Sequence, residues 1–233
     1  MWFKRIMSDY YKAYEKRYEV VHKSGSLWEI DKPTLEVYDT ILKYNIKKNS
    51  KILDIGCGEG RDARYLLDKG YNVLGIDCAS SAIKKCNELT NYSYEPHFKC
   101  LDFINDSLND KFDFIYSVCV VHMLLEETHR DSFYKFIFNH LKNEGIALII
   151  AMGNGQDEYK SKKEDAYKKT NRVNVNTKEN IKVVNTSCRI KNFINMKSEI
   201  ERNNLEIVEY ELVHDLPGFS SCLVFALRKN TQK

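Results

Sequence analysis

Short apolar runs recur along the first two thirds of the chain, with amphipathic stretches between them. The runs expected to be buried strands lie at 51–55, 72–76, 98–101, 112–118 and 145–151. Between the first two, the stretch 61–69 places Ala63, Leu66 and Leu67 on one face of a helix. Near-continuous apolar strands that alternate with helices are typical of a parallel sheet covered on both faces.

The alternation stops after the fifth predicted strand. Residues 153–182 are polar and rich in Lys and Asn, so they could form a flexible excursion or a short helical cover. The pattern then predicts a helix at 191–203 and strands at 205–212 and 222–227. A Pro-Gly pair, rather than a helix, separates these last strands, which predicts an antiparallel hairpin.

The amino-terminal segment is predicted to be helical. Tyr10, Tyr14 and Tyr18 fall on one face of a helix within 1–30, and Pro33 opens a second helix that runs to about residue 44. The tyrosine face could pack on the domain or form a lid over a ligand. The pattern alone leaves both interpretations open.

Together these elements predict one α/β domain over residues 1–233. The expected architecture is a Rossmann-like, doubly wound, mostly parallel seven-stranded sheet with a C-terminal antiparallel hairpin. Residues 1–45 would form an N-terminal helical cap, and residues 153–190 a polar insertion that covers part of the domain.

Composition narrows the classes of function. The net charge of +3 is too small to indicate nucleic-acid binding by itself, and no run approaches the roughly 18 apolar residues of a membrane span. The amino end lacks the apolar core of a secretory signal. The seven cysteines include no CxxC pair and the six histidines no HExxH arrangement, so we expect a cytoplasmic location and no metal.

A glycine-rich loop, Gly56-Cys57-Gly58-Glu59-Gly60, follows the first predicted strand. A dinucleotide fingerprint would need its third glycine at position 61, which is Arg61 here. Glu59 and Arg61 are expected to be solvated residues at a helix start, with Arg61 within reach of a substrate. Acids stand at or near the carboxyl ends of three strands, at Asp54, Asp77 and Asp102. Asp54 would repel a pyrophosphate but suits a ligand that bears a cation.

Five motifs occur in a fixed order between about residues 45 and 152: LDIGCGEG, GIDCASSAI, LDF, FDFIYSVCVVHML and GIALIIAM. This ordered set resembles that of the class I S-adenosylmethionine-dependent methyltransferases. The segment GCGEGRDARYLLDKGYNVLGID is most similar to the small-molecule branch that includes tellurite-resistance and thiopurine-type enzymes. The resemblance implies an S-adenosylmethionine cofactor and transfer of its methyl group to a small-molecule acceptor.

The resemblance also implies which residues hold the methionine part of the cofactor. The backbone around Gly56, Cys57 and Gly58 would lie against it, and its ammonium would point toward Asp54. Val118, at the end of the fourth strand, would lie near the methyl group.

The nucleoside part is implied to lie on the next two strands. Asp77 would accept hydrogen bonds from the two ribose hydroxyls, a task that suits a carboxylate. Cys78 would pack on one face of the adenine. Asp102 would accept the adenine amino group, and the Phe103 backbone would donate to a ring nitrogen.

The sequence does not determine a catalytic residue, because methyl transfer needs a general base only if the acceptor must lose a proton. His122, after the fourth strand, and His214, before the Pro-Gly turn, are candidates, and each could instead be structural. Trp28, Arg189 and His214 are candidates for the acceptor pocket. An arginine there would suit an anionic acceptor.

The amino-methylating DNA enzymes of this superfamily carry a Pro-Pro-aromatic motif after the fourth strand, and this sequence does not. We therefore expect a small-molecule methyltransferase, monomeric or homodimeric, that acts on neither nucleic acid nor membrane. Two alternatives remain. One is an RNA or protein methyltransferase that uses 153–182 as its contact, and the other is a cofactor-binding protein without transferase activity.

Overall fold

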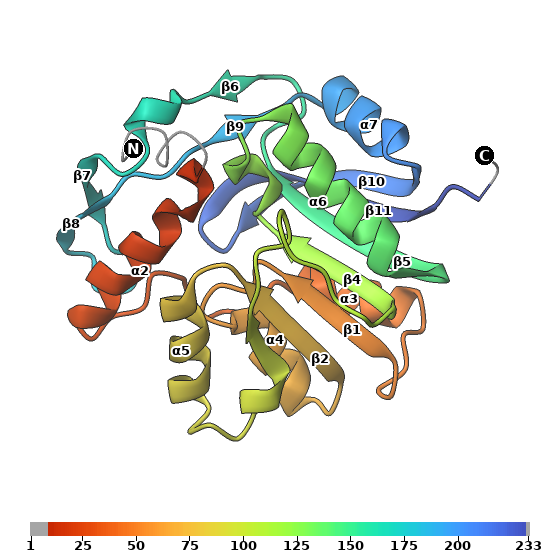
Figure 1. The fold of residues 1–233 in the computed structure, drawn as a ribbon, viewed down its shortest axis with the longest axis horizontal. Coiled ribbons are helices and arrows are strands. Elements are labelled where there is room, and N and C mark those ends of the chain that lie inside the picture. Colours follow the sequence, from red (N-terminus) through yellow and green to blue (C-terminus); the bar gives the residue numbers. More distant parts are fainter. Residues whose placement is uncertain (1–8, 232–233) are drawn as a thin grey trace.

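The centre of the molecule is a seven-stranded sheet (Figure 1). The computed structural model describes residues 9–231. Its strands follow the order β10-β11-β5-β4-β1-β2-β3. Their bounds are β1 Lys51–Ile55, β2 Asn72–Asp77, β3 Phe98–Cys100, β4 Phe112–Val118, β5 Leu141–Met152, β10 Leu205–Leu216 and β11 Phe219–Lys229.

The directions of the strands confirm the predicted fold class. The strands β1 to β5 pair in parallel, whereas β11 runs antiparallel between β5 and β10. The last two strands form the predicted hairpin, with Pro217 and Gly218 at its turn. Parallel strands place their carboxyl ends at one edge of a sheet, so the segments that follow β1, β2 and β4 meet there.

Helices cover both faces of the sheet. One face carries α3 (Leu35–Lys43), α4 (Arg61–Asp68) and α5 (Ser80–Leu89), and the other carries α6 (Glu127–His140) and α7 (Phe193–Arg202). Neighbouring residues of a strand point to opposite faces, so Ile52 joins the first layer and Leu53 the second. No helix within residues 9–231 is both long and apolar enough to cross a membrane.

Some element bounds differ from the sequence predictions. The helix α3 begins at Leu35 with Thr34 as its extended N-cap, so Pro33 precedes the helix instead of opening it. The hairpin strands are longer than predicted because β10 is largely solvent-exposed and its apolar alternation is weak.

The described part of the amino-terminal segment forms a cap at the carboxyl edge of the sheet. We define the cap as η1 (Tyr10–Lys12), α2 (Ala13–Lys23) and the loop to residue 31. A helix predicted within 1–30 is therefore confirmed over α2, whereas residues 24–30 are not helical. The part of that prediction that falls on residues 1–8 lies outside the described residues.

The polar insertion forms two small antiparallel sheets. The strand β6 (Tyr159–Lys160) pairs with β9 (Arg189–Ile190), and β7 (Lys169–Val173) pairs with β8 (Asn180–Val184). Apart from the short turn η4 (Lys163–Asp165), the segment is not helical, so the prediction of a short helical cover was wrong. Most side chains of β7 and β8 are exposed, so no apolar alternation marked them.

The insertion lies against the cap (Figure 1). The Arg17 side chain of α2 donates a hydrogen bond to the Val184 carbonyl at 3.0 Å. The side-chain amides of Asn174 and Asn176 donate to the Leu27 carbonyl at 3.1 and 3.0 Å. These contacts join two segments that are far apart in the sequence into one cover.

Candidate active site

A cavity of about 250 Å³ lies at the carboxyl edge of the sheet, beneath the cap. The ends of β1, β2 and β4 form its floor. Seven residues that the sequence assigned to the cofactor line it: Asp54, Gly56, Cys57, Asp77, Cys78, Phe103 and Val118. From the cap come Tyr11, Tyr14, Tyr18, Trp28 and Glu29. Of the tyrosine face, Tyr10 is buried in the core, whereas Tyr14 and Tyr18 line the cavity.

The glycine-rich loop has no room for side chains at two positions. Gly56 (φ +74°) and Gly58 (φ +55°) adopt the left-handed conformation that favours glycine. A Cβ on Gly56 would lie 2.4 Å from Cγ2 of Val120, and one on Gly58 would lie 2.0 Å from Oε1 of Glu29. Neighbouring groups thus approach the loop backbone directly, and the carboxylate of Glu29 covers Gly58.

Asp77 is held rigidly at the end of β2. Its carboxylate accepts hydrogen bonds from the backbone N–H groups of Gly58 at 3.0 Å and Ala79 at 2.8 Å. Burial raises its pKa to about 6, and these two hydrogen bonds oppose the rise. The side chain still lines the cavity, so its remaining lone pairs are available to a ligand.

Asp54 lies deeper, at the end of β1. It is only 3% exposed, and burial together with the nearby Asp62 raises its pKa well above the ordinary value. The hydroxyl of the neighbouring Tyr116 is buried and has no hydrogen-bond partner within residues 9–231. The cavity floor at Asp54 therefore retains hydrogen-bonding capacity that the described residues do not use up.

Asp102 lies beside the cavity rather than on its wall. Its carboxylate accepts hydrogen bonds from Tyr11 at 3.0 Å and Asn105 at 2.9 Å, and it pairs with Lys12 at 2.8 Å. Burial alone would raise its pKa, but the hydrogen bonds from Lys12 and Asn105 outweigh that effect and lower it. Because these groups occupy it, Asp102 anchors the cap, and the adenine role implied for it is not supported by its orientation.

One further candidate from the sequence, Trp28, also lines the cavity, and the guanidinium of Arg17 lies 4.6 Å from its ring centre. Burial raises the pKa of the Cys78 thiol well above its usual value, so Cys78 stays neutral and offers an apolar surface.

The other three candidates do not reach the cavity wall. The Arg189 guanidinium donates to the Leu125 carbonyl and pairs with Glu127, both at 2.6 Å, so it braces the start of α6. His214 is exposed on β10. His122 is buried behind Phe219, with ring centres 6.1 Å apart and no partner for Nδ1 within residues 9–231. The proximity of these residues in sequence to the pocket loops was misleading, because their side chains point elsewhere.

Glu59 is almost fully buried, at 1% exposed, which corrects its expected solvation. Its carboxylate accepts hydrogen bonds from the backbone N–H groups of Trp28 and Glu29, both at 2.9 Å. It also lies 2.7 Å from Nε2 of His22. Glu59 thereby fixes the cap above the glycine-rich loop. The only sign of this role in the sequence was an acid inside the glycine-rich loop. Its partners Trp28 and Glu29 lie 31 and 30 residues away in the sequence.

Arg61 is not solvated either. Its guanidinium lines the cavity, pairs with Asp62 at 2.7 Å and donates to Oγ1 of Thr34 at 2.8 Å. Burial opposes its charge, but Asp62 and the carboxylates of Glu29 and Asp54 outweigh burial and raise the pKa of Arg61. The site therefore contains a permanent cation.

The two sides of the cavity differ in chemistry. On the side of β1, β2 and the cap, the wall includes four carboxylates, Glu29, Asp54, Asp62 and Asp77, together with Arg61. On the side of β4 and the β10–β11 turn, the wall is apolar and includes Val120, Met123, Leu124, Pro217 and Phe219. Within residues 9–231, no group of three or more His, Cys, Asp or Glu side chains is arranged to hold a metal ion.

Parallel strands with a glycine-rich loop after β1, an acid at the end of β2 and an antiparallel β11 define the fold of the class I S-adenosylmethionine-dependent methyltransferases. The chain belongs to the family described as Tellurite resistance protein TehB, whose model matches residues 12–162. This match confirms the resemblance seen in the sequence.

Curated relatives share part of the chain. Phosphoethanolamine N-methyltransferase of Plasmodium falciparum is 28% identical over 178 residues, which are 73% of this chain and 64% of that protein. Ubiquinone biosynthesis O-methyltransferase of Rickettsia typhi is 30% identical over 122 residues, 51% of this chain and 47% of that protein. The matches thus span between about half and two thirds of the length of these relatives.

Solved structures share the fold. CcbJ methyltransferase of Streptomyces caelestis has a TM-score of 0.65 at 15% identity, and the match covers 92% of this chain and 98% of that one. The 1,6-didemethyltoxoflavin-N1-methyltransferase of Burkholderia thailandensis has a TM-score of 0.65 at 16% identity, covering 91% and 84%. That second structure contains bound 1,6-didemethyltoxoflavin and S-adenosylhomocysteine.

Proposed function

We propose that this chain is an S-adenosylmethionine-dependent methyltransferase that acts on a small molecule in the cytoplasm. The observation that carries the proposal is the cavity in which the backbone at Gly56, Asp54 and Asp77 meet. Membership of the TehB family supports it, as do the methyltransferase names of the sequence relatives and fold neighbours.

The residues present fit the cofactor. Asp77 is oriented by two backbone N–H groups and retains lone pairs for the two ribose hydroxyls. Cys78 and Phe103 offer apolar surface to the adenine ring. The Gly56 backbone and Val118 would lie along the methionine chain, where a Cβ at position 56 would clash with Val120.

S-adenosylmethionine, when bound, supplies a methyl group on a positively charged sulfur. The contribution of the chain is to hold the acceptor in line with that group and to keep water out. The apolar side of the cavity, which Met123 and Phe219 help to form, is suited to the acceptor. A largely apolar acceptor would bury its surface there.

The apolar side offers no general base within the described wall. Its one titratable side chain is Cys119, and the neighbouring Cys222 thiol together with burial raises the pKa of Cys119 well above its usual value. Burial and the nearby Arg130 lower the pKa of His122 to about 4, and His122 is off the wall. We therefore propose acceptors whose attacking atom already has a free lone pair at neutral pH, such as thiolates or neutral nitrogen heterocycles.

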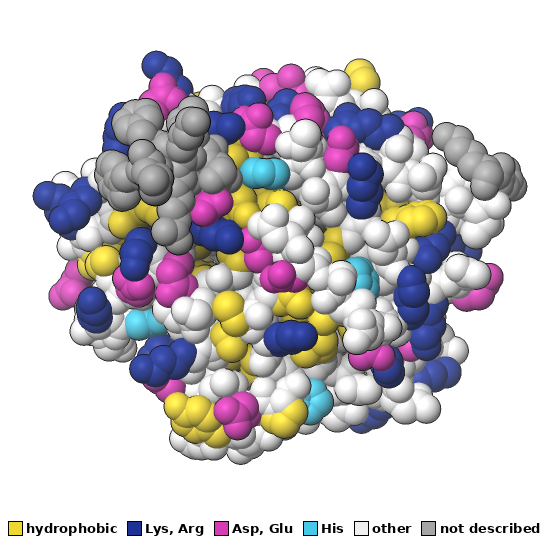
Figure 2. All heavy atoms as spheres, viewed as in Figure 1, with side chains coloured by type: hydrophobic (Ala, Val, Ile, Leu, Met, Phe, Trp, Pro, Cys, Tyr) yellow, Lys and Arg dark blue, Asp and Glu magenta, His cyan; other side chains and the backbone are white. Residues whose placement is uncertain are grey.

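The cover formed by the cap and the insertion supports a small acceptor over a macromolecule. On the face drawn in Figure 2, Lys and Arg side chains are interspersed with Asp and Glu side chains. A surface that follows a phosphate backbone would instead gather basic side chains along a track.

The direct test is transfer of a labelled methyl group from S-adenosylmethionine to a panel of acceptors. The panel contains apolar thiols, neutral nitrogen heterocycles, phenols, alkylamines, carboxylates and RNA. We expect transfer to the first two classes. Preference for RNA would favour the macromolecular alternative, and cofactor binding without transfer to any class would indicate a binding protein.

A further inference from the structure

We propose that Glu29, from the cap, and Arg61, from the start of α4, form a subsite for the zwitterionic amino-acid end of the cofactor, in which Glu29 holds the ammonium and Arg61 the carboxylate. This inference rests on the proposed function and deepens it. It gives the cap a role in recognising the ligand, whereas the motifs of the sequence place the cofactor only on the strand ends.

The first argument is the excess of carboxyl groups over cations on this side of the cavity. Four carboxylates line it, and Arg61 is the one Lys or Arg side chain on the described wall. Two of the carboxylates already accept from strong donors, and the remaining lone pairs of Asp77 are proposed above for the ribose hydroxyls. Asp77 accepts two backbone N–H groups, and Asp62 accepts the Thr34 N–H at 2.7 Å and pairs with Arg61.

The two remaining carboxylates are Glu29 and Asp54. Glu29 accepts a hydrogen bond from the Tyr18 hydroxyl at 3.0 Å, and Asp54 has the Tyr116 hydroxyl as its neighbour. A carboxylate offers about four acceptor sites, so both retain capacity for donors. An ammonium is a compact cation with three donors, and it would satisfy such a pair.

The second argument is the position of Glu29. The Oε1 atom of Glu29 lies only 2.0 Å from the position that a Cβ on Gly58 would occupy. The carboxylate therefore rests on the glycine-rich loop, beside which the methionine part of the cofactor is proposed to lie. The Glu29 backbone is held in place by Glu59 of the same loop.

The third argument is that Arg61 lies within the electrostatic reach of Glu29 and Asp54. An α-amino acid presents an ammonium and a carboxylate on one carbon. Two carboxylates beside one guanidinium are complementary to these two charged groups. The Nε and Nη2 atoms of Arg61 already donate to Asp62, so Nη1 is the group that would bind the ligand carboxylate.

The experiment compares four adenosine ligands by titration calorimetry. S-adenosylhomocysteine has both charged groups, and S-adenosyl-3-thiopropylamine has only the ammonium. The deaminated analogue of S-adenosylhomocysteine has only the carboxylate, and 5′-methylthioadenosine has neither. All four keep the nucleoside, so they separate the amino-acid end from the rest of the site.

We expect Glu29→Gln to weaken the two ammonium-bearing ligands about 10- to 100-fold and to leave the other two unchanged. Arg61→Lys should weaken the two carboxylate-bearing ligands. Glu19→Gln is the matched control, since Glu19 lies on the same cap and pairs with Lys16 at the surface.

Equal weakening of all four ligands by Glu29→Gln would show a merely structural role and overturn the inference, as would no weakening at all. The wild-type chain provides a second test that needs no variant, because S-adenosylhomocysteine should bind at least tenfold more tightly than its deaminated analogue. Failure of the wild type to bind S-adenosylhomocysteine would instead contradict the proposed function, so the two failures are distinguishable.

Discussion

The carboxylate of Glu59 lies 2.7 Å from Nε2 of His22, and this contact joins the glycine-rich loop to the cap. The same carboxylate accepts the backbone N–H groups of Trp28 and Glu29. A single buried side chain therefore connects the proposed cofactor loop with the segment that covers it.

Glu59→Ala should release the cap. It would leave the backbone N–H groups of Trp28 and Glu29 without their partner, which should lower the free energy of unfolding by about 2–4 kcal/mol. Hydrogen exchange of residues 24–31 should become faster, while exchange of the central strands should change little. The measurement is native-state hydrogen exchange, with Glu19→Ala as the control. Unchanged exchange in 24–31 would show that the cap is held by other contacts.

The same measurement tests the lid hypothesis. In the wild type, S-adenosylhomocysteine should slow hydrogen exchange in the cap and in 153–182 more than in β1, β2 and β4. Equal exchange with and without this ligand would show that neither segment acts as a lid.

Local patterns were sufficient to predict the sheet and the floor of the site. Most residues of β1, β4 and the second half of β5 are buried, so each of these reads as an apolar run. The acid at position 77 follows its strand directly, and sequence order alone places it at the carboxyl edge. The glycines at 56 and 58 were informative because their backbone conformation admits few other residues.

The roof and the far wall of the site could not be predicted in this way. Glu29 lies in an irregular polar segment, and its contact with Gly58 depends on how the cap folds back over the sheet. Phe219 reaches the cavity because the β10–β11 turn extends over the edge, whereas His214 on the same hairpin does not. Such contacts depend on tertiary packing, which leaves no periodic signal in the sequence.

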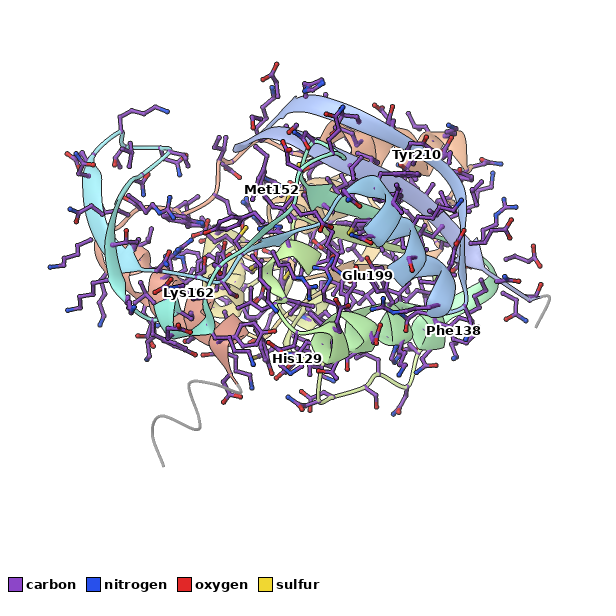
Figure 3. All side chains as sticks on the ribbon, turned by 90° about the horizontal axis from the view of Figure 1, so that it is seen from above. His129, Phe138, Met152, Lys162, Glu199 and Tyr210 are labelled. Carbon is purple, nitrogen blue, oxygen red and sulfur yellow. The ribbon has the colours of Figure 1, made fainter. Side chains whose placement is uncertain are left out.

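A buried ion pair supports the wall near the acceptor. The Arg130 guanidinium of α6 binds the Glu199 carboxylate of α7 through two hydrogen bonds of 2.7 Å, and both side chains are fully buried. Figure 3 labels Glu199 on α7. Arg130 also donates to the Val121 carbonyl at 2.7 Å, so it holds the turn that precedes Met123.

Glu199→Ala should lower the free energy of unfolding by about 3–5 kcal/mol, because it leaves the Arg130 charge buried without its partner. Urea denaturation measures this change. Glu201→Ala on the same helix is the control, since Glu201 is exposed and its loss should cost under about 0.5 kcal/mol. Similar costs for the two substitutions would contradict the buried-pair account.

Two substitutions on the β10–β11 hairpin test the acceptor side of the cavity. Phe219→Ala should raise the KM of an apolar acceptor about tenfold or more, because the ring forms part of the cavity wall. The affinity for S-adenosylhomocysteine should change little. His214→Ala, on the same hairpin but outside the cavity, should change neither quantity. Loss of activity in His214→Ala alone would restore His214 as a catalytic candidate.

Binding of the cofactor should be linked to proton release near neutral pH. Burial and the adjacent carboxylates raise the pKa of Glu29 to about 7, so a large fraction of this side chain is protonated at pH 7 without ligand. A ligand ammonium favours the ionised form and lowers the pKa, so a proton must leave on binding and affinity must fall as the pH drops below 7. The titratable and charged groups that face Glu29 are Tyr18, Asp54, Glu59, Arg61 and Asp62.

Calorimetry of S-adenosylhomocysteine binding in buffers of different ionisation enthalpy measures this release. Asp77, whose pKa is raised to about 6, would add a second release at lower pH when the ribose donates to it. Glu29→Gln should remove the component near pH 7 and leave the one near pH 6. An unchanged proton count in Glu29→Gln would mean that another group titrates.

The central claim is that the cavity at Gly56 and Asp77 binds S-adenosylmethionine. The most direct measurement is titration calorimetry of the wild type and Asp77→Ala with S-adenosylhomocysteine and with NAD, using the surface variant Asp110→Ala as a control. We predict one molecule of S-adenosylhomocysteine per chain with a micromolar-range Kd, about 10- to 100-fold weaker binding in Asp77→Ala, and no binding of NAD. Tight binding of NAD without binding of S-adenosylhomocysteine, or an affinity that Asp77→Ala leaves unchanged, would contradict the account.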